Sequence, residues 1–251
     1  MCGRYVMAQS IEDLADELDA EDIPEDRELA PSWNIPPTSD VPILLERFVD
    51  GTLRRQLHIA YWGLVPRWAK EQSIGVRSFN ARSETAAEKP TFRQALKSRR
   101  CAVPAEGYFE WLKGTGPAKQ PFYVHPSQEG KLITFAGLYE WWRDVSKEPD
   151  APDAWLLSTT ILTMAAPEPD HSVPVLAELG RLHDRLPIPL GKDSLAAWLD
   201  PSAEDGAGLL EMIRSRGYEE AASWTLDRAD PAVGNVRNNS PALLKETDIL
   251  F

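Results

Sequence analysis

Cys2 has the most distinctive chemistry in this sequence, because removal of Met1 would make it the N-terminal residue. An N-terminal cysteine carries a free α-amine and a thiol on adjacent carbons, and both groups titrate at mildly alkaline pH. The amine can condense with an aldehyde to an imine, and the thiol can then close a five-membered thiazolidine ring. The thiol can instead attack a carbonyl group, as the nucleophile of a hydrolase does. A cysteine without function is the third interpretation that this position allows.

Three polar segments embedded among apolar residues supply further candidates, at residues 78–85, 104–111 and 182–187. The first contains Asn80, and the second contains Glu110 between two aromatic residues. Apolar surroundings favour the protonated form of a carboxyl group, which suits Glu110 to general acid–base chemistry. A glutamate that faces solvent from an alternating strand is the alternative. The third segment contains His183, which an adjacent acid–base pair could orient; the other histidines fit structural or loop positions.

Other classes of site lack support. The two cysteines lie far apart and the four histidines are scattered, so no closely spaced pair of zinc ligands exists. No glycine-rich phosphate loop follows a predicted strand. We therefore expect neither a metal nor a cofactor. Two cysteines exclude a disulfide framework and favour a reducing compartment, the cytoplasm. No apolar run approaches the ~18 residues of a membrane span, and 251 residues suit a single domain, 1–251.

Local patterns predict the elements that position these residues. Residues 10–20 have helical spacing with Ser10 as the cap. Asp50-Gly51 predicts a hairpin between strands 41–48 and 53–62. Further strands are predicted at 101–111, 121–125, 132–142, 155–164 and 224–226, and helices at 83–98 (broken at Pro90), 195–199 and 209–213. Strands dominate and do not alternate with helices, so we expect an α+β fold around a mostly antiparallel, barrel-like sheet with flanking helices.

The charge balance gives a mixed indication about nucleic acid. The 39 acidic residues exceed the 27 basic ones, for a formal net charge of −12. Proteins that bind nucleic acid usually carry a basic face, so this total argues against such a partner. A local basic strip is nevertheless possible, because many cations fall in the first hundred residues: Arg4, Arg67, Lys70, Arg77, Arg82, Arg93, Arg99 and Arg100. Solubility conferred by net charge is the simpler explanation of the acidic total.

Eight segments, in order along the chain, resemble the motifs of the SRAP (SOS response-associated peptidase) family, whose members process abasic sites in DNA. They are residues 2–5, 33–37, 61–66, 80–85, 106–111, 119–123, 183–187 and 233–236. The resemblance covers residues 2–239, nearly the whole chain. It implies a single SRAP domain with an α+β, β-barrel-like fold.

The resemblance also implies a reaction. The N-terminal cysteine of the family forms a thiazolidine with the aldehyde of a ring-opened abasic sugar, which shields the lesion in single-stranded DNA as a covalent crosslink. Carried over, Cys2 is the crosslinking nucleophile, and Asn80 positions its amine and the sugar. Glu110 moves protons to and from the amine and the thiol, while His183 protonates the ring oxygen and assists reversal. The implied DNA-binding residues are Arg4, Asn34, Pro37, Trp68, Arg82 and Arg185. The arginines would contact phosphates, and Trp68 and Pro37 would stack on or wedge against the bases beside the lesion.

Two other functions remain open on the same residues. A cysteine peptidase would use Cys2 as nucleophile and His183 as base. A narrower version of this function is a single self-cleavage that removes the residues ahead of Cys2. Such an enzyme needs an oxyanion hole and a peptide groove, and neither is visible in the sequence. A non-enzymatic reader of single-stranded DNA is the third possibility. We expect a monomer with no membrane partner, whichever function holds.

Overall fold

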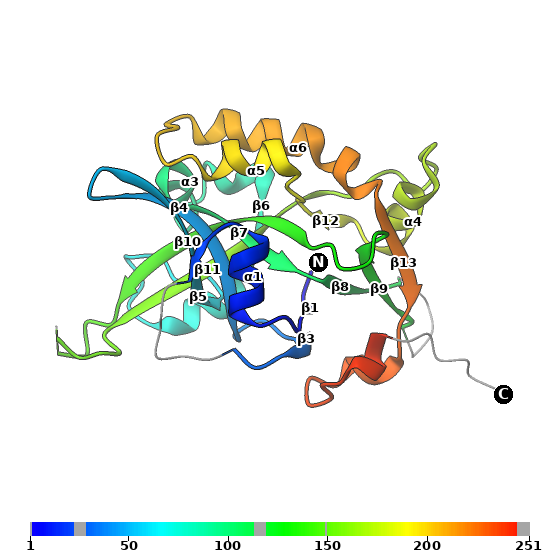
Figure 1. Cartoon of the computed structure of the whole chain (residues 1–251), viewed down its shortest axis with the longest axis horizontal. Coiled ribbons are helices and arrows are strands. Elements are labelled where there is room, and N and C mark those ends of the chain that lie inside the picture. The colour runs from blue at the N-terminus through cyan, green and yellow to red at the C-terminus, as the bar shows by residue number, and fades with distance from the viewer. Residues whose placement is uncertain (1, 23–28, 113–118, 149, 245–251) are drawn as a thin grey trace.

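The computed structural model describes residues 2–22, 29–112, 119–148 and 150–244, and Figure 1 shows their arrangement. Its centre is a closed five-stranded barrel made of β4 (Asp40–Val49), β5 (Thr52–Trp62), β7 (Arg100–Ala105), β10 (Ile133–Arg143) and β11 (Trp155–Ala165). Neighbouring strands are antiparallel, except that β5 and β11 pair in parallel and close the ring. The expected α+β fold with a mostly antiparallel, barrel-like core is confirmed.

Short strands extend this barrel sheet at three places. They are β2 (Glu21–Asp22) beside β5, and β6 (Asn80–Arg82) and β12 (Arg185–Pro187) beside β11. A second, antiparallel sheet has the order β13 (Trp224–Arg228), β9 (Pro121–Pro126), β8 (Gly107–Trp111), β1 (Tyr5–Met7) and β3 (Ser32–Ile35). The first strand of the chain therefore lies inside the second sheet, between β8 and β3.

Helices cover the outside of the two sheets. They are α1 (Ile11–Glu17), α2 (Ser83–Ala86), α3 (Arg93–Ser98), α4 (Pro174–Leu182), α5 (Lys192–Leu199) and α6 (Gly206–Ala221), with short 3-10 turns at Gln72–Arg77, Pro231–Gly234 and Pro241–Leu244. Ser10 caps α1 as predicted, since its Oγ accepts from the N–H of Asp13 at 3.1 Å. The expected helix at 209–213 is much longer, because Asp205 caps it and accepts from the N–H of Gly208 at 2.8 Å.

The single strand predicted at 101–111 is wrong, because the chain turns at Glu106 and divides into β7 and β8 in different sheets. The Glu106 carboxylate holds this corner by accepting hydrogen bonds from the N–H groups of Ala8 at 2.6 Å and Gln9 at 3.0 Å. Gly107 permits a close approach there, since a Cβ would lie 2.5 Å from the ring of Tyr123. The corner takes β8 out of the barrel and alongside β1.

The two sheets share one apolar core. Tyr5 of β1 contacts Trp62 of the barrel edge-on, with ring centroids 5.2 Å apart, and Tyr108 of β8 contacts Phe135 of the barrel in the same way at 5.7 Å. All four belong to the largest cluster of buried apolar residues in the described chain, which also contains Cys2. Aromatic pairs of this geometry add about 0.5–1.5 kcal/mol each beyond their area burial. The N-terminal strand is thus fixed firmly against the barrel.

Candidate functional site

Cys2 is buried immediately before β1, beside two other residues of the predicted site. It has no exposed surface, and its backbone carbonyl accepts a hydrogen bond of 2.7 Å from Nδ2 of Asn80. Burial raises the pKa of the Cys2 thiol well above its ordinary value, and the negative charge of Glu110 raises it further. A hydrogen bond from the Arg4 backbone lowers the pKa but does not compensate. At neutral pH the thiol is therefore a neutral S–H group.

Glu110 comes close to Cys2 because β1 and β8 are antiparallel neighbours. The N–H of Phe109 donates to the carbonyl of Arg4 at 2.9 Å, which fixes the register of the two strands. One step further along this register, Glu110 faces the residues that precede β1. The sheet thereby brings together two parts of the chain that are more than a hundred residues apart in the sequence.

The burial of Glu110 decides between the two orientations that the sequence allowed. Tyr108 packs into the main core, while Phe109 packs into a second apolar cluster, so β8 is covered on both faces. Glu110 is only 6 % exposed, and one carboxylate oxygen accepts a hydrogen bond of 3.2 Å from the N–H of Trp111. The buried orientation is confirmed, and the solvent-facing alternative is wrong.

Asn80 approaches Cys2 from the barrel. It begins β6, which runs parallel to β11 and pairs Asn80 with Ile161. Its Nδ2 group binds the Cys2 carbonyl, whereas its Oδ1 is buried and has no hydrogen-bond partner among the described residues. A buried acceptor without a partner costs about 1–3 kcal/mol. The Asn80 oxygen is therefore placed to accept a hydrogen bond from an amine or a bound ligand.

His183 follows α4 and precedes β12. Its Nδ1 accepts a hydrogen bond of 2.9 Å from the backbone N–H of Arg185. Because Nδ1 is an acceptor, the neutral imidazole carries its proton on Nε2, which is then the nitrogen that can donate. Thr163 of β11 pairs with Arg82 of β6 on one side and with Pro187 of β12 on the other. Two short strands therefore flank β11 on opposite sides: β6, which begins at Asn80, and β12, which follows His183.

Glu84 connects these two strands, a role that the sequence did not reveal. Both of its carboxylate oxygens accept hydrogen bonds of 2.8 Å from the guanidinium of Arg185, which also donates to the carbonyl of Thr163 at 2.6 Å. Partial burial alone raises the pKa of the Glu84 carboxyl, but the hydrogen bonds from Arg185 outweigh it and leave the pKa below its ordinary value. Arg185, predicted to bind phosphate, is therefore neutralised by a carboxylate. Glu84 lies within the 80–85 motif, but no local signal pairs it with a residue so distant in the sequence.

Arg4 and Asn34, both predicted to contact DNA, make hydrogen bonds within the protein. Arg4 donates through Nη1 to Oδ1 of Asn34 at 3.1 Å and to the carbonyl of Val233 at 3.0 Å, and its guanidinium lies 6.0 Å from the ring centre of Trp111. Asn34 is 2 % exposed. It has little surface to offer a ligand, whereas Arg4 is only partly buried.

The other predicted DNA-binding residues lie at the surface. Arg82 is exposed at the end of β6, and its guanidinium has no hydrogen bond or ion pair within the described parts of the chain. Trp68 is 57 % exposed, and its indole N–H donates a hydrogen bond of 3.4 Å to the carbonyl of Pro90. Pro37 is partly exposed in the turn between β3 and β4. Contact of these residues with DNA stays a prediction.

Several of the cations that could have formed a local basic strip are paired within the protein. Arg67 and Arg99 both bind the buried carboxylate of Glu140, at 3.0 and 2.9 Å. Arg100 does not belong to the surface at all: it is 3 % exposed, and its guanidinium donates to the carbonyls of Leu96, Lys97, Trp198, Asp200 and Ala203. These three of the eight cations are thus engaged inside the protein, and Arg82 is the exposed cation closest in sequence to Asn80.

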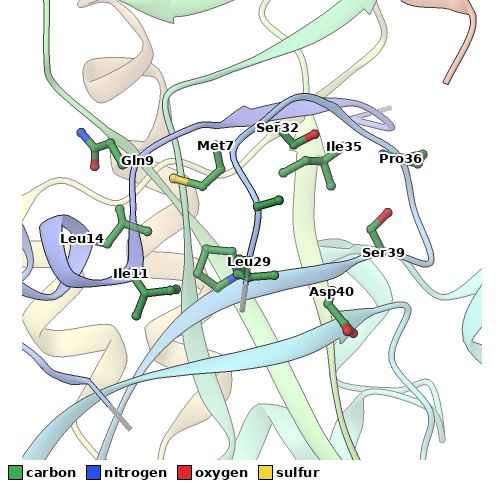
Figure 2. Close-up of a pocket in the computed structure, with 12 residues that line it drawn as sticks. Met7, Gln9, Ile11, Leu14, Leu29, Ser32, Ile35, Pro36, Ser39 and Asp40 are labelled. Carbon is green, nitrogen blue, oxygen red and sulfur yellow. The ribbon is translucent and has the colours of Figure 1, made fainter. Parts of the chain in front are cut away.

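A cavity of about 110 Å³ is lined by residues of β1, α1, β3 and β4 and the segment before β3 (Figure 2). Its walls are mainly apolar and come from Met7, Ile11, Leu14, Leu29, Ala30, Ile35, Pro36 and Pro42, with Gln9, Ser32, Ser39 and Asp40 as polar members. None of the four predicted catalytic residues lines it. This cavity is therefore separate from the site around Cys2.

In the described residues, no group of three or more His, Cys, Asp or Glu side chains is arranged to hold a metal ion. No helix among these residues combines the length and apolar character needed to cross a membrane.

Comparison with known proteins identifies the class that this fold and site define. The chain matches the sequence model of the SOS response associated peptidase (SRAP) family over residues 1–236. The chain belongs to the SRAP family, and the resemblance noted in the sequence is confirmed. The fold agrees: the crystal structure of a protein from Bacteroides thetaiotaomicron superposes with a TM-score of 0.74 at 22 % identity, covering 98 % of this chain and 100 % of that one.

Curated relatives give this family a more specific label. The chain is 31 % identical over 245 residues to the "Abasic site processing protein YoqW" of Bacillus subtilis, covering 98 % of this chain and 99 % of the relative. It is 30 % identical over 253 residues to the "Abasic site processing protein HMCES" of Pongo abelii, covering 88 % of this chain and 66 % of the relative. The SRAP region is thus shared by bacterial and vertebrate proteins of different length.

Proposed function

We propose that this protein processes abasic sites in single-stranded DNA by forming a covalent thiazolidine crosslink through Cys2. The observation that carries the proposal is the environment of Cys2. Its backbone carbonyl accepts a hydrogen bond from Asn80, and the residue lies beside the buried carboxylate of Glu110. The names of the relatives support an abasic site as the substrate.

The reaction balances with the groups present. With Met1 removed, the α-amine of Cys2 adds to the C1′ aldehyde of the ring-opened sugar and one water leaves, which gives an imine. The thiol then adds to the imine carbon, its proton passes to the nitrogen, and the ring is a thiazolidine. The unpartnered oxygen of Asn80 can hold the amine, and Glu110 can accept the thiol proton as the sulfur attacks. His183 can donate through Nε2 to the ring oxygen of the closed sugar.

The raised pKa of the Cys2 thiol favours this reaction over peptide hydrolysis. Cysteine peptidases use a thiolate that a neighbouring cation stabilises, which lowers the thiol pKa. Here burial and the negative charge of Glu110 raise the thiol pKa, and they outweigh the lowering by the positively charged amino terminus. An iminium carbon is a strong electrophile that a thiol can attack while a base removes its proton, so the neutral thiol is no obstacle to ring closure.

We further propose that residues 1–251 form a single domain, monomeric in solution, that contacts the DNA strand with Arg82 and Trp68. Both side chains are exposed, and Arg82 is two residues from Asn80. Aromatic stacking and phosphate contacts give sequence-independent binding, as a lesion reader needs. Light scattering of the purified protein tests the monomer, and a dimer mass would overturn it.

A denaturing gel tests the crosslink. The protein is mixed with a labelled single strand that carries one abasic site, beside an intact strand, after mass spectrometry shows that Met1 is absent. We expect a denaturation-resistant band on the abasic strand alone, lost in Cys2→Ala and kept in Cys101→Ala, because Cys101 is buried inside the barrel. Cys2→Ser separates the steps, since its amine forms an imine that borohydride traps but no thiazolidine. No band with the wild-type protein would refute the proposal.

A further inference from the structure

Asn34 fixes a segment from the other end of the chain. Its Nδ2 group donates to the carbonyls of Val233 at 3.1 Å, Asn235 at 3.1 Å and Asn238 at 2.9 Å. One buried amide thus holds three backbone carbonyls, one within the 3-10 helix Pro231–Gly234 and two in the loop that follows it. Hydrogen bonds from a buried side chain to otherwise exposed carbonyls define a single loop conformation.

The polar side chains of residues 234–239 are used inside the loop. Oδ1 of Asn235 accepts from the N–H of Arg237 at 3.1 Å, and Nδ2 of Asn238 donates to the carbonyl of Ala232 at 2.8 Å. Oδ1 of Asn239 accepts from the N–H of Trp33 at 2.7 Å, which ties the loop to β3. These bonds hold the segment in shape without using the side chains of its two central residues.

Val236 and Arg237 are the side chains that this loop presents outward. Val236 is 47 % exposed, and Arg237 is exposed with a guanidinium that has no hydrogen bond or ion pair to any residue in the described ranges. Fixing the backbone before a ligand arrives removes part of the entropy cost of binding. A free cation on a fixed loop is therefore suited to bind an anion.

The loop adjoins the Cys2 site through Arg4. The same Nη1 atom of Arg4 that donates to Asn34 also donates to the carbonyl of Val233 at 3.0 Å. Arg4 is two residues from Cys2, and its carbonyl accepts from Phe109, next to Glu110. A DNA strand whose abasic sugar reaches Cys2 would therefore have neighbouring phosphates on the side of the loop.

We propose that segment 234–239 is a contact surface for the DNA strand on one side of the lesion, with Arg237 bound to a backbone phosphate and Asn34 as its positioning residue. The proposal rests on the proposed function, which supplies the strand. A protein of net charge −12 repels DNA at long range, so isolated cations fixed next to the site become important for binding.

The test compares Arg237→Gln with a matched control, Arg216→Gln. Arg216 is also exposed and lies in α6, which runs along the upper edge of the molecule in Figure 1, whereas the 3-10 turns Pro231–Gly234 and Pro241–Leu244 lie at its lower edge. Binding is measured by fluorescence anisotropy on a single strand that carries a tetrahydrofuran analogue of the abasic site. The analogue has no aldehyde, so wild-type Cys2 stays in place and no crosslink forms.

One phosphate contact on a single strand changes the slope of log K against log salt by about 0.7, which corresponds to about fivefold in affinity between 1 M and 0.1 M salt. We therefore expect Arg237→Gln to lower affinity about fivefold at 0.1 M salt and to reduce the slope by about 0.7, with Arg216→Gln unchanged. The fivefold loss of affinity in Arg237→Gln should disappear when the DNA strand is shortened on one side of the lesion, and it should persist when the strand is shortened on the other side.

Equal slopes for the two variants would overturn the proposal. A deficit that survives shortening on both sides would also overturn it, because Arg237 would then act through the protein rather than through the strand. Crosslinking of the wild-type protein to a true abasic strand is measured in parallel. If the crosslink forms while the salt slopes of the two variants are equal, the proposed function is supported and the DNA contact at 234–239 is refuted. If no crosslink forms but the salt slopes differ, the crosslinking function is refuted and the DNA contact is supported.

Discussion

The pair formed by Glu84 and Arg185 gives the most direct test of how the fold positions the site. Glu84→Gln keeps the size of the side chain but removes its charge and one of its two acceptor oxygens. Hydrogen bonds to charged groups contribute about 1.5–3 kcal/mol. The pair is partly open to solvent, with side chains 35 % and 14 % exposed, so screening reduces this to about 1–2 kcal/mol. For a chain of this length, that loss lowers Tm by roughly 2–8 °C.

The same loss should slow the chemistry more than it changes binding. Glu84 holds the end of the strand that carries Asn80 to the strand that follows His183. If the whole loss of 1–2 kcal/mol adds to the activation free energy of crosslinking, the crosslinking rate at saturating DNA falls about five- to thirty-fold. Single-turnover kinetics on an abasic strand measure this rate, and anisotropy measures affinity. Glu88→Gln removes the same charge from an exposed position nearby and is the control.

Two results would refute this reasoning. An unchanged rate at saturating DNA, with Tm lowered, would show that the Glu84–Arg185 pair stabilises the fold without positioning the site. Tighter binding of intact DNA, with a salt slope increased by about 0.7, would show that Arg185 is a phosphate ligand that Glu84 competes for. In that case the carboxylate limits DNA binding rather than holding His183 in place.

Three further variants test separate parts of the argument. Trp68→Ala should weaken binding of single strands by about 1–3 kcal/mol, measured by anisotropy, with stability changed by less than about 0.5 kcal/mol; unchanged affinity would exclude stacking. Glu110→Gln should lower the pKa of the Cys2 thiol, so alkylation by iodoacetamide at pH 8 should accelerate while crosslinking slows. The expected acceleration is about three- to fourfold per unit of pKa, because the thiolate fraction rises tenfold while the nucleophilicity of the thiolate falls. An equal alkylation rate would contradict the electrostatic coupling. Burial raises the pKa of the Cys101 thiol to about 12 from an ordinary value of 9.0, so its contribution to stability is complete below pH 9 and is lost as pH rises toward 12. Cys101→Ala should make the alkaline fall in unfolding free energy shallower by about 1.4 kcal/mol per pH unit, measured by urea denaturation between pH 9 and 11, and an unchanged slope would contradict the burial effect.

Local sequence signals predicted the parts of the fold that local forces determine. Asp50 and Gly51 adopt φ of 49° and 76°, the left-handed values that a two-residue hairpin requires, and the strands on either side follow from that turn. Pro90 separates α2 from α3 as expected. The buried Glu110 could be recognised only as one of two possibilities, because alternation on β8 fails where apolar clusters cover both faces.

The remaining features depend on contacts between distant residues. Glu106 has no local mark of a corner, because its partners are N–H groups about a hundred positions earlier in the chain. Strands of three or four residues, such as β1, β6 and β12, are too short to show a period. Asn34 and Arg185 are expected to contact DNA because polar side chains in a matching motif indicate function, but each also makes hydrogen bonds to residues at least a hundred positions away in the chain. Only the folded arrangement distinguishes a ligand-binding side chain from one that is already bonded.

The bonds from Arg4 and Asn34 to residues 233–238 have a consequence for the biosynthesis of the protein. At about 5–20 residues per second, a ribosome needs roughly 10–40 s to extend the chain from Asn34 to Asn238. During that time Arg4, two residues from Cys2, lacks the hydrogen bond to the Val233 carbonyl that it makes in the finished fold, so the start of the chain is held less firmly. The aminopeptidase that must remove Met1 for the proposed reaction therefore has this interval to work in. Once the late segment docks, Arg4 is held by Asn34 and Val233 together, and the strand that begins beside Cys2 takes its final position.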